Sequence, residues 1–201
     1  MYGSTFWDER YAQEDYVYGE KPNDFLVSQV ARIKPNSHIL CLAEGEGRNA
    51  VYLAQLGHNV TAVDISVVAL DKGRKLADKA GVKVSWQHAD LADYILAHDK
   101  WDLIVAIFMH LPEIIRDRVF AQIKTALRPG GLFIGEFYRP DQLRFKTGGP
   151  QDIKMLYSLC TLNEQLAGLA ISHLEACERH VNEGTGHTGL AAVSQVVAVK
   201  S

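Results

Sequence analysis

The feature that most constrains this chain is a repeated alternation of nearly apolar segments with amphipathic segments between residues 25 and 137. The apolar segments have the length of strands, and a continuous apolar run such as 101–108 is typical of a strand buried on both faces. Buried strands that alternate with helices predict an α/β fold with a Rossmann-like, doubly wound and mostly parallel sheet. The expected strands are 38–43, 59–63, 82–86, 101–108 and 132–137, and the expected helices are 25–33, 49–56, 66–80 and one from Pro112 to the break at 128–131.

The alternation stops after Tyr138. Residues 139–150 have the composition of a loop that ends in Gly148-Gly149-Pro150, and a short helical region follows. Two further strand-like segments, 170–181 and 190–199, are separated only by the connection 182–189. A connection this short predicts an antiparallel pair at the edge of the sheet, because parallel strands need a longer crossover. We therefore expect a seven-stranded sheet with an antiparallel C-terminal strand pair.

No internal repeat or Ser/Gly linker divides the 201 residues, so we expect a single domain, 1–201. Within it we expect an N-terminal helical cover (1–36), a core of regular alternation (37–138) and a C-terminal part with a loop and two strands (139–201). The chain has 21 basic and 24 acidic residues and a formal net charge of -3. That balance gives no broad basic surface for a phosphate backbone, so nucleic acid is not the expected partner.

Three further observations concern compartment and metals. The first five residues carry neither a cationic leader nor an apolar signal core, and the longest strongly apolar run, 103–109, is too short to span a bilayer. Cys41, Cys160 and Cys177 are odd in number and widely spaced, which is typical of reduced thiols. Neither the cysteines nor the eight histidines show the spacing of a metal site. The sequence predicts a cytoplasmic protein with no membrane segment and no bound metal.

A glycine-rich turn, 44–50, follows the first strand and opens a helix. Glycines permit unusual backbone angles and let a ligand approach the main chain closely, and the open strand ends form a natural ligand crevice. The alternative is that the turn serves only structural packing. The pattern Gly45-x-Gly47-x-x-Ala50 also satisfies the fingerprint of dinucleotide-binding proteins, so an NAD enzyme remains an alternative. Against that alternative, a long aromatic segment precedes the first strand, and a strand pair follows in place of a catalytic domain.

Two aspartates follow the next strands. Asp64 ends the second strand, where its carboxylate can accept hydrogen bonds from both hydroxyls of an adenosine ribose. Asp90 lies just past the third strand, where it can accept a hydrogen bond from an adenine amino group. The alternatives are structural: Asp64 as a cap before Ser66, and Asp90 as a turn residue. Together with the glycine turn, the aspartates predict an adenosine-containing ligand at successive strand ends.

Five segments resemble the successive motifs of class I S-adenosylmethionine-dependent methyltransferases: 39–50, 60–66, 89–91, 101–112 and 127–137. The aromatic segment 6–19 looks like that of the small tellurite-resistance and thiopurine-type methyltransferase group. The resemblance covers almost the whole chain through Phe137 and implies an enzyme with S-adenosylmethionine as methyl donor. It leaves two rivals open, an NAD-dependent oxidoreductase and a non-catalytic S-adenosylmethionine-binding protein.

The chain departs from the family at two positions. The family usually has an acidic residue where Cys41 stands and a glycine where Ala43 stands. The resemblance implies that Glu44 or Glu46 supplies the displaced carboxylate for the methionine amino group; the alternative is that either side chain faces solvent. It also implies that Arg10 and Tyr18 cover the methionine end of the donor, and that residues 107–108 touch adenine or donor. The expected donor-binding residues are Arg10, Tyr18, Glu44, Gly45, Glu46, Gly47, Asp64, Ile65, Asp90, Leu91, Ile107 and Phe108.

Methyl transfer needs the donor and acceptor in near-attack geometry, and needs a general base only when the acceptor arrives protonated. His110, after the fourth strand, is the candidate base, with a helix cap or a surface role as the alternative. Arg139, Arg144 and His187 are candidates for binding the acceptor, with a solvated basic loop as the alternative for the arginines. We expect a small-molecule acceptor whose reacting atom, like the oligomeric state, the sequence leaves open.

Overall fold

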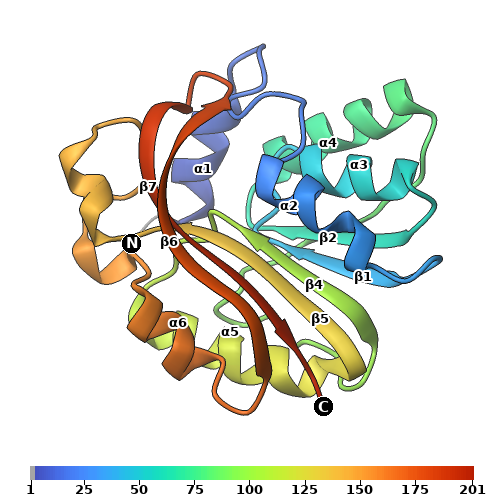
Figure 1. Ribbon diagram of the computed structural model, residues 1–201. Helices are drawn as coiled ribbons and strands as arrows, with labels where there is room; N and C mark the ends of the chain where they lie inside the picture. Colours follow the sequence, from blue (N-terminus) through green and yellow to red (C-terminus); the bar gives the residue numbers. More distant parts are fainter. Residues whose placement is uncertain (1–2) are drawn as a thin grey trace.

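Seven strands form one sheet in the order β3-β2-β1-β4-β5-β7-β6 (Figure 1). The computed structural model describes residues 3–201. Met1 and Tyr2, which belong to the expected N-terminal cover and to the segment expected to carry no signal sequence, lie outside the described residues. The first five strands pair in parallel, whereas β7 runs antiparallel to both β5 and β6. The predicted fold is thus confirmed. The strands are β1 (His38–Leu42), β2 (Asn59–Asp64), β3 (Ser85–His88), β4 (Trp101–Ile107), β5 (Leu127–Tyr138), β6 (Ala170–Glu183) and β7 (His187–Val199).

Helices cover both faces of the sheet (Figure 1). In β1, Leu40 and Leu42 pack into the cluster that includes α5, whereas Ile39 and Cys41 pack into the cluster of α2 and α3 on the opposite face. This alternation follows from the period of two in a strand, so a nearly apolar sequence fills two cores at once. The helices are α1 (Ser4–Tyr11), α2 (Asp24–Gln29), α3 (Arg48–Gln55), α4 (Val67–Ala80), α5 (Glu113–Ala126) and α6 (Leu159–Gln165), with short 3-10 helices η1 (Val30–Arg32), η2 (Pro140–Arg144) and η3 (Ile153–Met155).

Polar caps fix where the helices begin. The Ser66 side chain accepts a hydrogen bond from the Ala69 N–H at the start of α4, as its position after β2 predicts. Asn23 caps α2 in the same way by accepting from the Leu26 N–H. Gly81, with φ of 68°, ends α4 in the left-handed conformation that glycine adopts readily.

Several boundaries differ from the sequence expectation. Strand β3 begins at Ser85 and not at residue 82, because the Val82 N–H is used to close the end of α4 on the Ala77 carbonyl. Strand β5 begins at Leu127, which pairs with Trp101, and the expected break at 128–131 is an irregularity within the strand. Strands β6 and β7 extend to Glu183 and His187, so the expected connection 182–189 shrinks to the turn 184–186.

The N-terminal segment closes over the carboxyl ends of the strands. The Ser66 hydroxyl lies 2.6 Å from Asp8 Oδ1 of α1, and Lys72 Nζ of α4 donates to the carbonyl of Asp15 at 2.7 Å. The Gly186 N–H donates to the Val17 carbonyl at 2.8 Å, which joins the β6–β7 turn to the same segment. Within residues 3–201 no helix combines the length and hydropathy of a membrane span.

Candidate functional site

A cavity of about 300 Å³ lies above the carboxyl ends of β1, β2 and β4, between the N-terminal segment and the start of β7. This is the crevice where open parallel sheets bind ligands. Most of the residues expected from the sequence line it, including the candidate base. They are Arg10, Tyr18, Glu44, Glu46, Asp64, Ile65, Asp90, Leu91, Ile107, Phe108, His110 and His187.

Asp64 is buried on the cavity wall at the end of β2. Its Oδ2 accepts a hydrogen bond from the Gly45 N–H at 2.7 Å, and its Oδ1 accepts one from the Ser66 N–H at 2.9 Å. Burial raises the pKa of this carboxyl to about 6 in spite of these two bonds. No Lys, Arg or His among residues 3–201 forms an ion pair with it. The carboxylate is therefore oriented by backbone but has no side-chain counter-ion.

Glu44 is held in a similar way at the first turn of α3. Its Oε1 accepts hydrogen bonds from the N–H groups of Asn49, at 3.0 Å, and Ala50, at 2.7 Å. Burial raises the pKa of this carboxyl to about 7. Glu46 differs, because its Oε1 lies 2.5 Å from Nζ of Lys72. Of the two glutamates that line the cavity, only Glu46 already has a cation within the described chain.

Two non-glycine residues on the cavity wall have left-handed backbone. Ala43 follows β1 with φ of 49°, at the position where the resemblance predicts a glycine, and Phe108 follows β4 with φ of 52°. The Phe108 N–H donates to the Glu136 carbonyl at 2.7 Å, which helps to hold this conformation. Such strain persists where the surrounding structure enforces it and is concentrated at ligand sites.

Asp90 is an exposed residue in the turn after β3, and it also lines the cavity. Its Oδ1 accepts a hydrogen bond from the Ala92 N–H at 2.8 Å. Asp90 is therefore both a turn residue, which was the structural alternative considered from the sequence, and a residue of the cavity wall.

The two glycines of the turn, neither of which lines the cavity, have different surroundings. Gly45, with φ of 62°, donates to Asp64, and a Cβ added there would lie 2.8 Å from the Tyr11 hydroxyl. Gly47, with φ of 90°, does not line the cavity, and an added Cβ would lie 2.6 Å from the Trp86 ring and 3.0 Å from Cα of Gly73. The structure therefore gives Gly47 a role in packing α3 against α4, which is the structural alternative to the donor contact expected from the sequence.

His110 lines the cavity, but backbone groups occupy both of its ring nitrogens. Its Nδ1 lies 2.8 Å from the Met155 carbonyl, to which it donates, so its Nε2 accepts the Tyr138 N–H at 3.3 Å. Burial lowers the pKa of the ring to about 4. This geometry does not support the general-base role expected of His110, because neither nitrogen is free to exchange a proton with an acceptor.

His187, at the start of β7, lies among aromatic rings. Its ring centroid is 4.4 Å from that of Tyr18, 4.7 Å from that of Phe108 and 5.1 Å from that of Tyr138. Its Nδ1 is 3.8 Å from Oε2 of Glu183, its partner across the β6–β7 pair. Burial lowers the pKa of His187, although the neighbouring Glu183 carboxylate opposes that effect.

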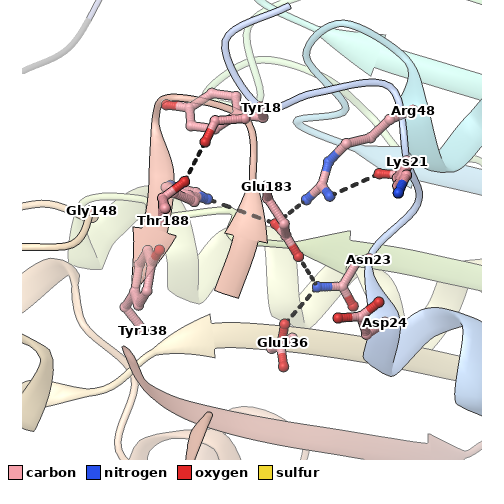
Figure 2. Close-up of polar contacts among 12 residues, drawn as sticks. Tyr18, Lys21, Asn23, Asp24, Arg48, Glu136, Tyr138, Gly148, Glu183 and Thr188 are labelled. Carbon is pink, nitrogen blue, oxygen red and sulfur yellow. Dashed lines mark hydrogen bonds and ion pairs between the residues drawn. The ribbon is translucent and has the colours of Figure 1, made fainter. Parts of the chain in front are cut away.

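Glu183 belongs to a buried charged network, part of which Figure 2 shows, with Asn23 between Glu183 and Glu136 and Arg48 on the other side of Glu183. Asn23 Nδ2 donates to both glutamates, and Arg48 pairs with Glu183 at 2.5 Å. Arg179 pairs with Glu136 at 2.5 Å and with Glu183 at 3.3 Å. Burial acts to raise the pKa of Glu183, but His187 and Arg48 outweigh it and hold the pKa at about 2.

The structure does not bring Arg139 or Arg144 to the cavity. Arg139 pairs with Asp141 at 2.7 Å, and Arg144 pairs with Asp141 and Glu178 at 3.3 Å. These neighbouring acids hold both guanidinium groups away from the cavity, which corrects the expected placement. From the loop 139–150 only Gly149 and Pro150 line it.

Sequence reasoning missed the network around Glu183. One signal was available: Glu136 is a charged residue in the otherwise apolar run 132–137, where a buried charge requires partners. The pairing of Glu183 with His187 had no such signal, because it depends on the length of the β6–β7 turn. Among residues 3–201 no group of three His, Cys, Asp or Glu side chains gathers in a way that suits a metal ion.

Comparisons with known proteins agree with this geometry. Residues 39–131 match a family model described as a methyltransferase domain. The tRNA 5-carboxymethoxyuridine methyltransferase of Escherichia coli K12 is 29% identical over 104 residues, which are 50% of this chain and 40% of that protein. The chain thus spans about two fifths of the length of this curated relative.

Solved structures match over nearly the whole chain. A protein studied for the conversion of a disulfide bond into a thioacetal group during echinomycin biosynthesis has a TM-score of 0.77 at 17% identity, covering 98% of this chain and 92% of that one. TehB from Haemophilus influenzae has a TM-score of 0.73 at 17% identity, covering 98% of this chain and 67% of that one. These similarities confirm the fold predicted from the sequence.

Proposed function

We propose that the protein transfers a methyl group from S-adenosylmethionine to a small molecule, because residues 39–131 match a methyltransferase domain and proteins of the same fold include S-adenosylmethionine-dependent methyltransferases. The observation that carries the proposal is the pair of buried carboxylates, Glu44 and Asp64, which face the cavity and form no ion pair with any side chain of residues 3–201. A ligand that brings an ammonium group and ribose hydroxyls compensates both of them.

The residues present fit this donor. Asp64 would accept hydrogen bonds from the ribose hydroxyls. Glu44 would bind the methionine ammonium, because Cys41 stands at the position where the family usually has an acidic residue. Glu46 suits that role less well, because Lys72 neutralises it. Asp90, Leu91 and Ile107 line the part of the cavity nearest β3 and β4, where they would contact adenine.

At the other end, Arg10 and Tyr18 would cover the methionine part. The Arg10 Nε donates to the Tyr18 hydroxyl at 2.9 Å, so the two side chains already form a single wall. When bound, S-adenosylmethionine supplies a methyl group activated by a sulfonium charge. The chain orients that group and excludes water, which are the main requirements of an in-line transfer.

A small acceptor is favoured by the size of the cavity and by the charge of the chain. The space of about 300 Å³ is bounded by α1 and by Gly149 and Pro150, which leaves little depth for a polymer. The formal net charge of -3 does not favour a phosphate backbone. The tRNA-modifying relative keeps nucleic acid as the alternative that an acceptor screen must include.

Titration calorimetry with S-adenosylmethionine and with NAD tests the donor. We expect binding of S-adenosylmethionine alone, and binding of NAD alone would support the oxidoreductase. A metabolite extract with methyl-labelled donor, beside total tRNA, then tests the acceptor. Label in a small molecule is expected; label in tRNA would overturn the acceptor class. Donor that binds but is never consumed would favour a non-catalytic binding protein.

A further inference from the structure

We propose that His187 and Glu183 form a catalytic dyad in which His187 is the general base for an aromatic acceptor that reacts through a weakly acidic O–H or S–H group. The inference rests on the proposed methyl transfer and names the substrate class of the same site. It assigns to His187 the role that the geometry of His110 does not allow.

The register of the β6–β7 pair brings the two residues together. Glu183 and His187 are partners across the turn, and the carboxylate Oε2 lies 3.8 Å from Nδ1 of the ring. Nδ1 is buried and has no hydrogen-bond partner within residues 3–201. A carboxylate on this side favours the proton on Nδ1, so Nε2 carries the free lone pair. His187 lines the cavity, and in the proposed dyad Nε2 is the atom that accepts the proton there.

Glu183 is fixed by partners that do not depend on a ligand. Arg48, Arg179 and Asn23 all contact its carboxylate. Its two oxygens are therefore held in one position, and its negative charge persists at neutral pH. A fixed anion beside Nδ1 stabilises the imidazolium that forms when Nε2 takes a proton.

The walls around His187 indicate the acceptor. The rings of Tyr18 and Phe108, which line the cavity with Pro150, lie 4.4 Å and 4.7 Å from the His187 ring, and Tyr138 packs against His187 at 5.1 Å from outside the cavity. Such walls favour a flat apolar molecule through ring contacts. A neutral amine needs no base, whereas a phenol or an aromatic thiol gains from one. The site therefore fits an aromatic alcohol or thiol.

The proposed step balances in protons and electrons. The acceptor oxygen or sulfur forms a bond to the methyl carbon and leaves the former methyl–sulfur electron pair on the donor sulfur, which becomes a neutral thioether. The acceptor proton passes to Nε2 of His187. The resulting imidazolium is paired with Glu183 and later releases its proton to solvent.

The test uses His187→Gln, with His180→Gln as the matched control, because His180 is an exposed histidine on β6. Phenol, thiophenol and aniline serve as probe acceptors with methyl-labelled donor. We expect wild-type protein to methylate phenol or thiophenol, with turnover that rises with pH as Nε2 loses its proton. His187→Gln should lower this turnover about 100-fold or more and remove the pH-dependent limb, while donor affinity stays within about twofold. The charged and titratable groups that face His187, and whose charge affects its protonation, are Glu183, Arg48, Arg10, Tyr18, Tyr138 and His110.

A second measurement does not depend on turnover. Nitrogen-15 NMR of the histidine rings should show His187 with its proton on Nδ1, and Glu183→Gln should shift that signal. If Glu183→Gln does not fold, His187→Gln still identifies the signal and its tautomer. A proton on Nε2, a retained pH limb in His187→Gln, or methylation of aniline alone or of no probe would overturn the dyad or its acceptor class. Wild-type protein that does not bind the donor would instead overturn the proposed function.

Discussion

Two pairs of buried carboxylates in this molecule are alike in burial and opposite in electrostatics. Glu44 and Asp64, beside β1 and β2, are 9% and 6% exposed, and Glu136 and Glu183, on β5 and β6, are 0% and 5% exposed. The first pair receives backbone N–H groups, and burial raises its pKa values to about 7 and 6. The second pair is bonded to arginines, and the pKa of Glu183 falls to about 2.

The difference shows that the hydrogen-bond and ion-pair partners of a buried carboxylate, and not its burial, decide whether it is available to a ligand. A charge already compensated by arginines can hold elements together but has little left to offer a ligand. A buried carboxylate without a cation is stabilised when a cationic or hydroxyl-bearing ligand arrives. In the proposed function, Glu44 and Asp64 bind the donor, whereas Glu136 and Glu183 hold the β6–β7 hairpin in place. In the proposed dyad, Glu183 acts on His187 and not directly on the ligand.

The largest expected effect, on the free energy of unfolding, comes from removing an arginine whose positive charge balances the second pair of carboxylates. Arg179→Met leaves the fully buried Glu136 without its guanidinium partner, and we expect the free energy of unfolding to fall by about 3–5 kcal/mol. Urea denaturation measures it, with Arg74→Met on the surface of α4 as the control. A loss below about 1 kcal/mol would mean that this pair is not held by its arginine.

Glu44→Gln is the corresponding change in the first pair. Glutamine keeps the oxygen that accepts from Asn49 and Ala50 but removes the charge. We expect the affinity for S-adenosylmethionine to fall by about 1.5–3 kcal/mol, roughly 10- to 150-fold, while the fold persists. Calorimetry measures this, with the exposed Glu175→Gln as control; equal affinity in both variants would remove Glu44 from the donor site.

The raised pKa of Glu44 also predicts a pH dependence. The folded state keeps a proton on Glu44 up to about pH 7, whereas the unfolded chain releases it near the ordinary value of 4.5. The folded state therefore binds more protons between these values, and its stability falls as pH rises through that window. Relative to Glu44→Gln, wild-type protein should lose on the order of 2 kcal/mol between pH 4.5 and 7.

Urea denaturation of both proteins at several pH values measures this difference. Subtracting one curve from the other removes the opposite contributions of His110 and Glu183, whose lowered pKa values make the fold more stable as pH rises. Parallel curves would show that Glu44 is ionised in the free protein.

The smallest effect is expected outside both pairs. Arg144 is exposed and pairs with Asp141 and Glu178 at the surface. Arg144→Ala should change the free energy of unfolding by less than about 0.5 kcal/mol and leave donor affinity within about twofold. A clear loss of turnover in this variant would restore the acceptor role that the sequence suggested.

The sequence predicts the fold, and many of the residues that line the cavity at the strand ends, for one physical reason. Buried strands and the turns that follow them are encoded within short segments, so Asp64 and the 44–50 turn could be placed without knowing the rest of the chain. The His187 side of the cavity is encoded differently. Whether His187 faces a carboxylate depends on a turn length and a strand register, which local patterns specify poorly.

His110 illustrates the same limit within a correctly predicted region. Its position after β4 was expected, and it does line the cavity. Its hydrogen bonds, however, go to the backbone of Met155 and Tyr138, and these segments lie 45 and 28 positions away along the chain. A sequence pattern cannot show that such distant backbone groups will occupy both nitrogens.

The place of β7 between β5 and β6 has a consequence for how the chain folds. Strand β6 precedes β7 in the chain, yet it reaches the sheet only through β7, so it has no strand to pair with until β7 has been synthesised. Asn23 and Glu183 are 160 positions apart, and contacts of such separation carry a large loop-closure cost before they add stability. We therefore expect the cavity wall on this side to assemble late, after the parallel strands, with β6 exposed to mispairing in the interval.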